Sequence, residues 1–149
     1  MSEVLIHTAS PETVALSVLA DLRGGQISEA TVRFAEDFRF RDHGIGLEFT
    51  DKVRLMEFFQ KGRELYPDST LIPDRTIACG EDAAVEWTYR VTITEPFYGG
   101  LQRRLPVSVQ GASVVRTHNG EITEWADYYD GLKSRCTALA AHFEEWTEL

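Results

Sequence analysis

The sequence predicts a single α+β domain in which a curved, antiparallel or mixed sheet wraps around N-terminal helices. The first half of the chain has helical hydrophobic spacing, the second half is rich in alternating β-branched and aromatic residues, and turn residues separate these segments. Helices followed by a run of strands are typical of α+β proteins, in which the two kinds of element segregate. With 149 residues, the chain has room for one hydrophobic core.

Three helices are expected before the strand-rich half. The first covers "SPETVALSVLADLRGG", with Ser10 as N-cap and a stop at Gly24 and Gly25. The second covers "ISEATVRFA" with Ser28 as its cap, and the third covers "TDKVRLMEFFQKGRELY" with Thr50 as its cap. Between these two helices, "DFRFRDH" alternates as a strand until "GIG" breaks it.

Four further strands are expected in "STLIPDRTIAC", "AAVEWTYRVTIT", "RRLPVSVQGASVVRT" and "EITEWADYY". The turn between the last two contains Asn119-Gly120, a pair that favours the primed turns of tight hairpins. An extra helix over about residues 131–148, with Asp130 as N-cap, then closes the chain. We therefore expect one domain over residues 1–149, with its core over about residues 10–133.

Composition argues against several classes of partner and cofactor. A net charge of −9 disfavours nucleic-acid binding, and no apolar run approaches the ~20 residues of a membrane-spanning helix. The start of the chain does not resemble a signal peptide, and two distant cysteines without a CxxC motif suggest a reducing, cytoplasmic location. Four dispersed histidines and the lack of GxSxG, GxGxxG or Walker motifs predict neither a metal nor a cofactor.

The last strand places an acid among aromatic rings. Because side chains alternate along a strand, Trp125, Asp127 and Tyr129 share one face. Burial among rings raises the pKa of a carboxyl group, as a general acid or base at neutral pH requires. The structural alternative is a strand-end Asp127 held by backbone amides or an arginine. Helix capping accounts for the nearby Asp130.

The first strand repeats this arrangement. Phe38, Phe40 and Asp42 share a face, which makes Asp42 a second acid on an aromatic face. The alternative for Asp42 is a turn in which its side chain accepts hydrogen bonds from the loop backbone. His43 adjoins it on the opposite face, where a surface or interface histidine is expected.

The strand over residues 84–94 has one apolar and one polar face. The apolar face holds Val85, Trp87, Tyr89, Val91 and Ile93, and the polar face holds Glu86, Thr88, Arg90, Thr92 and Thr94. An inward polar face would let Arg90 line a cavity and pair with Asp127, and the outward apolar face would then need a second subunit. With the apolar face inward, Arg90 would face solvent. Residue types alone leave both arrangements open.

Two segments carry a resemblance to a known family. "FAEDFRFRDHGIG" after the second helix and "NGEITEWADYYD" in the last strand resemble the SnoaL-like polyketide cyclases over about residues 10–133. This family belongs to the nuclear transport factor 2-like superfamily, together with limonene epoxide hydrolase and ketosteroid isomerase. The resemblance implies a cone-shaped fold with an apolar pocket between sheet and helices, and a homodimer formed through the outer sheet face. It also favours the inward placement of Arg90.

The resemblance also implies residue roles. Asp127 matches the acid/base of the cyclases, and Arg90 matches the arginine of the epoxide hydrolase Asp-Arg-Asp relay. Thr92 replaces the second acid of that relay, so epoxide hydrolysis by this mechanism is not expected. Asp42 matches the general base of the isomerase, but Val18 replaces its oxyanion-hole tyrosine, so steroid isomerisation is not expected either.

We therefore expect a cofactor-independent, polyketide cyclase-like enzyme. Asp127 would be the general acid/base on a hydrophobic carbonyl compound, with Arg90 setting its pKa and Asp42 as a second acid. The reaction would be a ring closure, an isomerisation or a hydration. The expected substrate-binding residues are Phe38, Phe40, Trp125, Tyr129, Thr88 and Thr92. The alternative is a non-catalytic ligand-binding or protein-interaction module, and a cavity reached by both acids would favour the enzyme.

Overall fold

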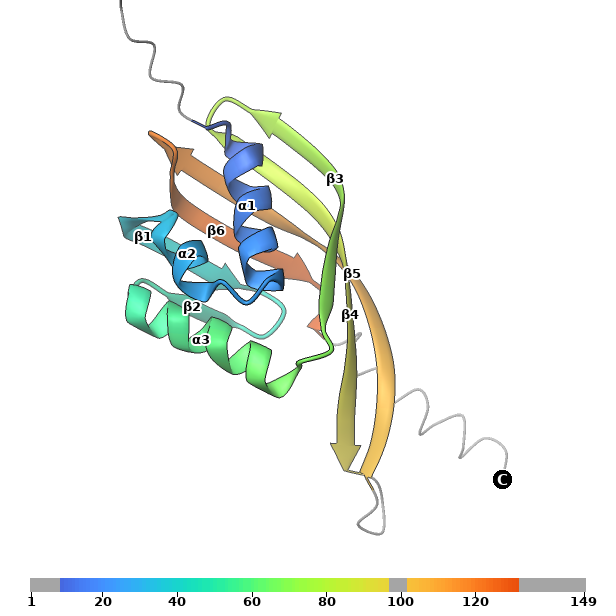
Figure 1. Ribbon diagram of the computed structural model, residues 1–149. Coiled ribbons are helices and arrows are strands. Elements are labelled where there is room, and N and C mark those ends of the chain that lie inside the picture. Colours follow the sequence, from blue (N-terminus) through green and yellow to red (C-terminus); the bar gives the residue numbers. More distant parts are fainter. Residues whose placement is uncertain (1–8, 97–101, 132–149) are drawn as a thin grey trace, which may run out of the picture.

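A computed structural model describes residues 9–96 and 102–131. The elements in chain order are α1 (Pro11–Arg23), α2 (Ile27–Val32), β1 (Phe34–Asp42), β2 (Leu47–Phe49), α3 (Lys52–Leu65), β3 (Thr70–Cys79), β4 (Asp82–Pro96), β5 (Gln102–His118) and β6 (Glu121–Tyr129). Figure 1 shows the three helices on one side of a curved sheet. The expected α+β architecture is confirmed, and the expected C-terminal helix lies outside the described residues beyond residue 131.

The sheet has the order β2-β1-β6-β5-β4-β3. Every neighbouring pair is antiparallel except β1 and β6, which are parallel. β4 and β5 form a long hairpin that extends past the helices (Figure 1). β5 and β6 are joined at Asn119 and Gly120, whose φ angles of 50° and 79° suit the expected primed turn.

The helix caps were predicted in part. Ser10 caps α1 as expected, because its Oγ accepts a hydrogen bond from Thr13 N at 3.3 Å. In α3 the cap is Asp51 rather than Thr50, since the Asp51 carboxylate accepts from Arg54 N at 3.0 Å and its charge suits a helix N-terminus. The cap expected at Ser28 is also wrong, because α2 begins one residue before it without a side-chain cap.

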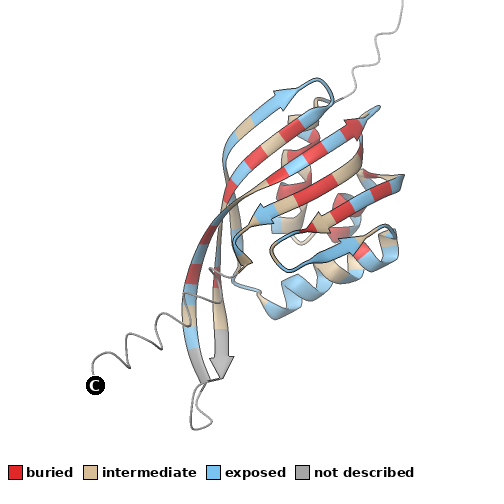
Figure 2. Ribbon diagram, turned by 180° about the vertical axis from the view of Figure 1, so that it is seen from behind, coloured by how far each residue is buried: buried red, intermediate tan, exposed pale blue. Residues whose placement is uncertain are grey.

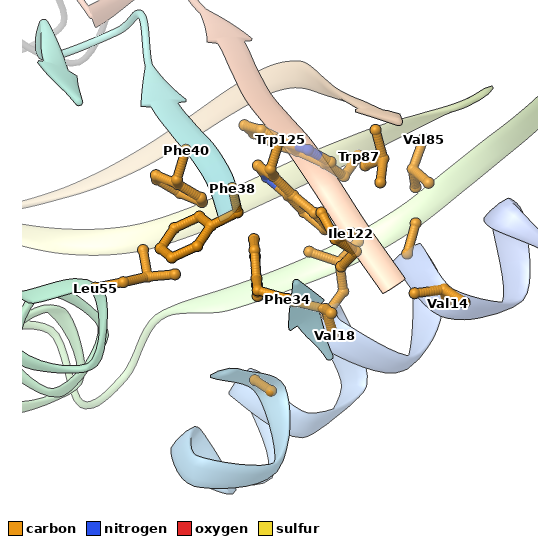
Figure 3. Close-up of a cluster of buried hydrophobic side chains, with 14 residues drawn as sticks. Val14, Val18, Phe34, Phe38, Phe40, Leu55, Val85, Trp87, Ile122 and Trp125 are labelled. Carbon is orange, nitrogen blue, oxygen red and sulfur yellow. The ribbon is translucent and has the colours of Figure 1, made fainter. Parts of the chain in front are cut away.

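The core lies between the helices and the inner face of the sheet. Phe34, Phe38 and Phe40 of β1 pack with Trp125 of β6, and Phe34 and Phe38 meet edge to face at 5.3 Å between ring centroids. Figure 3 shows these rings from β1 and β6 gathered with Leu55 of α3. Aromatic packing therefore fixes how the ends of β1 and β6 sit beside each other.

The apolar face of β4 points inward. Figure 2 shows buried and exposed residues alternating along the strands, and Val85, Trp87 and Val91 are among the buried ones. Arg90 is exposed on the other face, so its predicted place beside Asp127 is wrong. Burying a row of apolar side chains is favourable, whereas burying a guanidinium without a partner is costly.

Two predicted pocket residues share this correction. Thr88 and Thr92 alternate with the inward residues of β4, and both hydrogen-bond acids near the β3 side of the sheet. Thr88 Oγ1 donates to Asp74 Oδ2 at 2.7 Å, and the Thr92 side chain hydrogen-bonds Asp68. Neither threonine faces the core with Asp127. Because the apolar face of β4 is already covered by the core, it does not need a second subunit to bury it.

Candidate active site

The two predicted acids lie side by side at the ends of β1 and β6. Asp42 and Asp127 are direct register partners in this parallel pair, and His43 N donates to Asp127 O at 2.9 Å just beyond them. Register partners of neighbouring strands point to the same face and are about 5 Å apart. The structure thus brings together the two carboxylates that strand alternation placed on aromatic faces.

Asp127 is held by neutral hydrogen-bond donors. Its Oδ1 accepts from Ser113 Oγ at 2.5 Å and from Trp125 Nε1 at 2.7 Å. Ser113 Oγ in turn accepts from Trp87 Nε1 at 2.9 Å. Ser113, Trp87 and Trp125 are all buried, while Asp127 itself is partly buried. The Asp127 carboxylate is therefore the final acceptor of hydrogen bonds whose donors, Trp87, Ser113 and Trp125, are buried from water.

The pKa of Asp127 is raised from an ordinary 3.8 to about 7, and burial is the largest cause. The hydrogen bonds from Ser113 and Trp125 oppose this rise, and the negative charge of Asp42 contributes to it. At neutral pH the carboxyl group is therefore present in both its acid and its base form. This is the protonation behaviour that general acid–base chemistry requires.

Asp42 has a partly structural role. Its Oδ1 accepts from Gly44 N at 3.0 Å and from Ile45 N at 3.2 Å, so it closes the turn after β1 as the alternative interpretation expected. Its carboxylate also hydrogen-bonds the Tyr129 hydroxyl. Burial first, and then Asp42, raise the pKa of Tyr129 above its usual range, so this phenol stays a hydrogen-bond donor.

A glycine fixes the position of the Tyr129 ring. A Cβ atom at Gly44 would lie 2.0 Å from the ring carbon Cζ, so the ring occupies space that any other residue would fill. Gly111 has the same relation to Trp87, because its Cβ would lie 2.5 Å from the indole carbon Cη2. Both rings beside the acids therefore depend on a neighbouring glycine.

A cavity of about 240 Å³ opens between α1, α3 and the strands β3 and β4. Its lining is mainly apolar and consists of Leu19, Leu22, Arg23, Ile27, Phe58, Phe59, Gly62, Arg63, Tyr66, Pro67, Ser69, Leu71 and Tyr89. Arg63 belongs to α3 and reaches the C-terminal end of α1. There its Nη1 donates to the carbonyls of Leu22 and Arg23, each at 3.3 Å. Such a lining suits an apolar ligand that carries few polar groups.

Among the described residues, neither Asp42 nor Asp127 lines this cavity. Tyr89, which does line it, packs with Tyr129 against the core and against a second apolar cluster of Val91, Val107 and Val109. The Tyr129 ring in turn lies 6.0 Å from Trp87, centroid to centroid. A layer of aromatic rings therefore stands between the cavity and the acids.

Three predicted pocket residues belong to the core instead. Phe38, Phe40 and Trp125 are at most 3% exposed and are absent from the cavity lining. Figure 3 shows all three within the buried apolar cluster. The prediction that they contact substrate is not supported by this placement, because the helices already cover them. Of the predicted lining residues, Tyr129 is the one that stays partly exposed beside the acids.

Sequence reasoning missed Ser113 and the donor role of Trp87. The available signal was strand alternation, which places Ser113 between Gly111 and Val115 on a mainly apolar face of β5. A hydroxyl on a buried face needs a partner. Here the partners are Asp127 and Trp87.

The described part of the chain offers neither a metal cluster nor a membrane helix. Over residues 9–96 and 102–131, no three His, Cys, Asp or Glu side chains are arranged to hold a metal ion. Within the same residues, no helix combines the length and the apolar character needed to cross a bilayer.

Solved structures share the fold at low sequence identity. A protein from Shewanella putrefaciens, provisionally named a SnoaL-like polyketide cyclase, is 12% identical, with a TM-score of 0.73 over 87% of this chain and 96% of its own. IdmH from Streptomyces antibioticus, provisionally named a polyketide cyclase, is 18% identical, with a TM-score of 0.70 over 84% of this chain and 95% of its own.

A third similar structure comes from Catenulispora acidiphila and is described as having a ketosteroid isomerase-like fold, in complex with trimethylamine. It is 23% identical, with a TM-score of 0.68 over 81% of this chain and 87% of its own. A comparison with curated proteins finds no significant match. The family model of the SnoaL-like domain matches residues 8–125, which is most of the chain. The protein therefore belongs to the SnoaL-like domain family.

Proposed function

We propose that the protein is a small-molecule enzyme that uses Asp127 as its general acid/base. The observation that carries this proposal is the Asp127 carboxyl group, which has a pKa of about 7 and is paired with a second acid, Asp42, at the ends of β1 and β6. A group with this pKa can accept a proton from one atom of a substrate and return it to another. Such transfers drive ring closure, isomerisation and hydration without a cofactor.

The substrate class is a hydrophobic compound with a carbonyl group. The apolar cavity supports the hydrophobic part, and the provisional names of two similar structures favour carbonyl ring closure. Removing a proton next to a carbonyl forms an enolate, which needs a hydrogen-bond donor. The Tyr129 hydroxyl stays protonated and lies beside Asp42 and Asp127, so we assign it to this role, in which its hydrogen turns from Asp42 to the enolate oxygen. Asp42 holds Tyr129 and acts as the second acid.

A non-catalytic ligand-binding module is the second candidate. The observation in its favour is the cavity lining, which contains neither Asp42 nor Asp127 among the described residues. In that case a ligand would occupy the cavity alone, and Asp127 would remain a buried polar anchor of β5 and β6. Fold alone does not decide between these functions, because a shared fold hosts many activities.

A ligand screen with aromatic polyketides, steroids and epoxides tests the proposal, using the wild type and Asp127→Asn. The asparagine retains an oxygen that can accept from Ser113 and Trp125 but cannot exchange a proton at neutral pH. We expect any turnover to fall about 10²- to 10⁴-fold while binding persists, since general acid–base catalysis contributes about this much. Turnover that is unchanged in the variant would refute the role of Asp127, and binding without turnover would favour the second candidate.

We also propose a homodimer through the outer sheet face and a cytoplasmic location. On that face, Ile72 of β3, Val114 of β5 and Tyr128 of β6 are 45–46% exposed. Large apolar side chains on one sheet face are typical of subunit interfaces. The exposed free thiol of Cys79 suits a reducing compartment.

A further inference from the structure

We propose that Trp87 and Ser113 are positioning residues that restrict the exchangeable proton of Asp127 to its Oδ2 atom. This inference rests on the proposed function, because it concerns the oxygen through which Asp127 would act. A buried chain of hydrogen bonds links Trp87, Ser113 and Asp127, and each of these bonds has a definite direction.

The direction is fixed at Trp87. An indole N–H can donate a hydrogen bond but cannot accept one. Because Trp87 Nε1 lies 2.9 Å from Ser113 Oγ, the serine oxygen must be the acceptor of this bond. The Ser113 hydroxyl hydrogen is then free to point elsewhere, and Asp127 Oδ1 lies 2.5 Å away.

Oδ1 of Asp127 therefore receives two donors. Ser113 Oγ donates to it on one side, and Trp125 Nε1, another group that can only donate, reaches it at 2.7 Å. Both lone pairs of Oδ1 are thereby used. Among the described residues, no donor reaches Oδ2. The two oxygens of this carboxyl group are thus chemically different before any ligand binds.

The opposite arrangement leaves a buried donor unpaired. If neutral Asp127 carried its proton on Oδ1 and donated it to Ser113, the Ser113 hydroxyl hydrogen would need another acceptor. Ser113 is 1% exposed, and within the described residues its hydroxyl hydrogen-bonds only with Trp87 and Asp127. An unpaired buried hydroxyl is unfavourable, so the proton of the acid form resides on Oδ2.

As a consequence, Asp127 exchanges protons with the substrate through Oδ2 alone. In the base form, an Oδ2 lone pair takes a proton from the substrate, which leaves the bonding electrons on the substrate as an enolate or alkoxide. In the acid form, the Oδ2–H bond returns that proton and restores the carboxylate, so atoms and charge balance over the cycle. The titratable groups that face this carboxyl from the described elements are Asp42 on β1, Tyr129 on β6 and, through Tyr129, Tyr89 on β4.

Neutron diffraction from deuterated crystals at a pH below the Asp127 midpoint locates the proton directly. We expect deuterium on Oδ2 of Asp127, with the Ser113 deuterium directed at Oδ1. Deuterium on Oδ1 would overturn the assignment, whether or not the protein has any catalytic activity.

Variants test the same chain in solution through the ¹³C NMR titration of the Asp127 carboxyl carbon. Ser113→Ala removes a hydrogen bond to the charged form, so we expect the midpoint to rise by about one pH unit. Ser113→Thr keeps the hydroxyl and should return the midpoint close to that of the wild type. Ser108→Ala, an exposed serine on the same strand, is the matched control and should leave the midpoint unchanged.

Trp87→Phe provides an independent variant if Ser113→Ala does not fold. It removes the donor that orients Ser113 while keeping an aromatic ring over Gly111, so the midpoint should rise by less than in Ser113→Ala. Midpoints in Ser113→Ala or Trp87→Phe that equal that of Ser108→Ala would contradict the proposal. Since the titration needs no substrate, its outcome is separate from the turnover of Asp127→Asn, which tests the proposed function.

Discussion

Asp127 differs from the surface carboxylate of Glu48 in the charge of its neighbours. Glu48 on the surface pairs with Arg39, and this partner lowers the pKa of Glu48. Asp127 instead has neutral donors and the acid Asp42, so burial raises its pKa. The outward placement of Arg90 is therefore chemically important, because an arginine beside Asp127 would stabilise the charged form and suppress its acid function.

The raised pKa of Asp127 predicts a specific pH dependence of stability. The folded protein holds the Asp127 proton up to a pH of about 7, whereas the unfolded chain releases it near 3.8. Between these values the folded state binds more protons, so the contribution of Asp127 to the free energy of unfolding falls as pH rises and levels off above about 7. Asp127→Asn should lack this decline.

Urea unfolding of the wild type and Asp127→Asn at pH 4 to 8 measures this effect. The stability of the wild type relative to the variant should decrease steadily between pH 4 and about 7. Asp37→Asn, which changes an exposed acid of β1, should show no such trend. A constant difference between the wild type and Asp127→Asn over this range would mean that Asp127 titrates normally.

At the residue scale, strand alternation identified Asp42 and Asp127 because it fixes which side chains share a face. It could not identify the inward face of β4, so Arg90 was misplaced. That choice depends on how much apolar area the whole strand buries, which a single position does not reveal. The pairing of Ser113 with Asp127 likewise depends on the register of β5 and β6, which the sequence does not specify.

At the element scale, the cap of α3 predicts that the adjacent residues Thr50 and Asp51 contribute differently to the free energy of unfolding. Asp51→Ala removes the acceptor of the Arg54 N–H and a favourable charge at the helix start, so it should cost about 1 kcal/mol of unfolding free energy. Thr50→Ala, at the position expected from sequence, should change stability by less than about 0.5 kcal/mol. Chemical denaturation compares the two, and an equal loss would contradict the Asp51 cap.

Two glycine substitutions test the close packing of β5. Gly111→Ala places a Cβ 2.5 Å from Trp87 Cη2 and 2.7 Å from Tyr128 O, so it should destabilise the protein by about 1–3 kcal/mol. Gly62→Ala in α3 meets no atom within 4 Å and should stabilise by about 0.4–1 kcal/mol. Thermal unfolding measures both. An unchanged thermal stability of Gly111→Ala would show that the Trp87 indole moves freely over β5.

The longer helices and strands were predictable because each has its own hydrophobic periodicity and has capping or turn residues at its ends. β2 was missed, since Leu47–Phe49 is too short to show alternation and exists through its pairing with β1. The caps of α2 and α3 were misplaced by one or two residues. Adjacent polar residues compete for the same role there, and only backbone geometry decides between them.

At the scale of the whole molecule, the proposed dimer places a second copy on the outer face of the curved sheet. We expect sedimentation to give twice the chain mass, and Val114→Glu to shift the protein toward the monomer, because it places a charge in the proposed interface. Val53→Glu, at a more exposed residue of α3, is the matched control and should leave the mass unchanged. A wild-type monomer at all concentrations would contradict the dimer.

The fold also separates two parts of the proposed machinery. Helices α1 and α3 shape the cavity, while the ends of β1 and β6 carry the acids, and Tyr89 and Tyr129 stand between them. The resemblance predicted a pocket in this region. It could not predict this partition, which arises from how the aromatic side chains of this sequence fill the space.

The central claim is that the Asp127 carboxyl group exchanges its proton near neutral pH. The most direct test is the ¹³C NMR titration of that carboxyl carbon in the wild type, with its resonance identified by its loss in Asp127→Asn. We expect a midpoint of about 7. A midpoint near the ordinary aspartate value of 3.8 would contradict it, because Asp127 would then be fully ionised at neutral pH and unable to donate a proton.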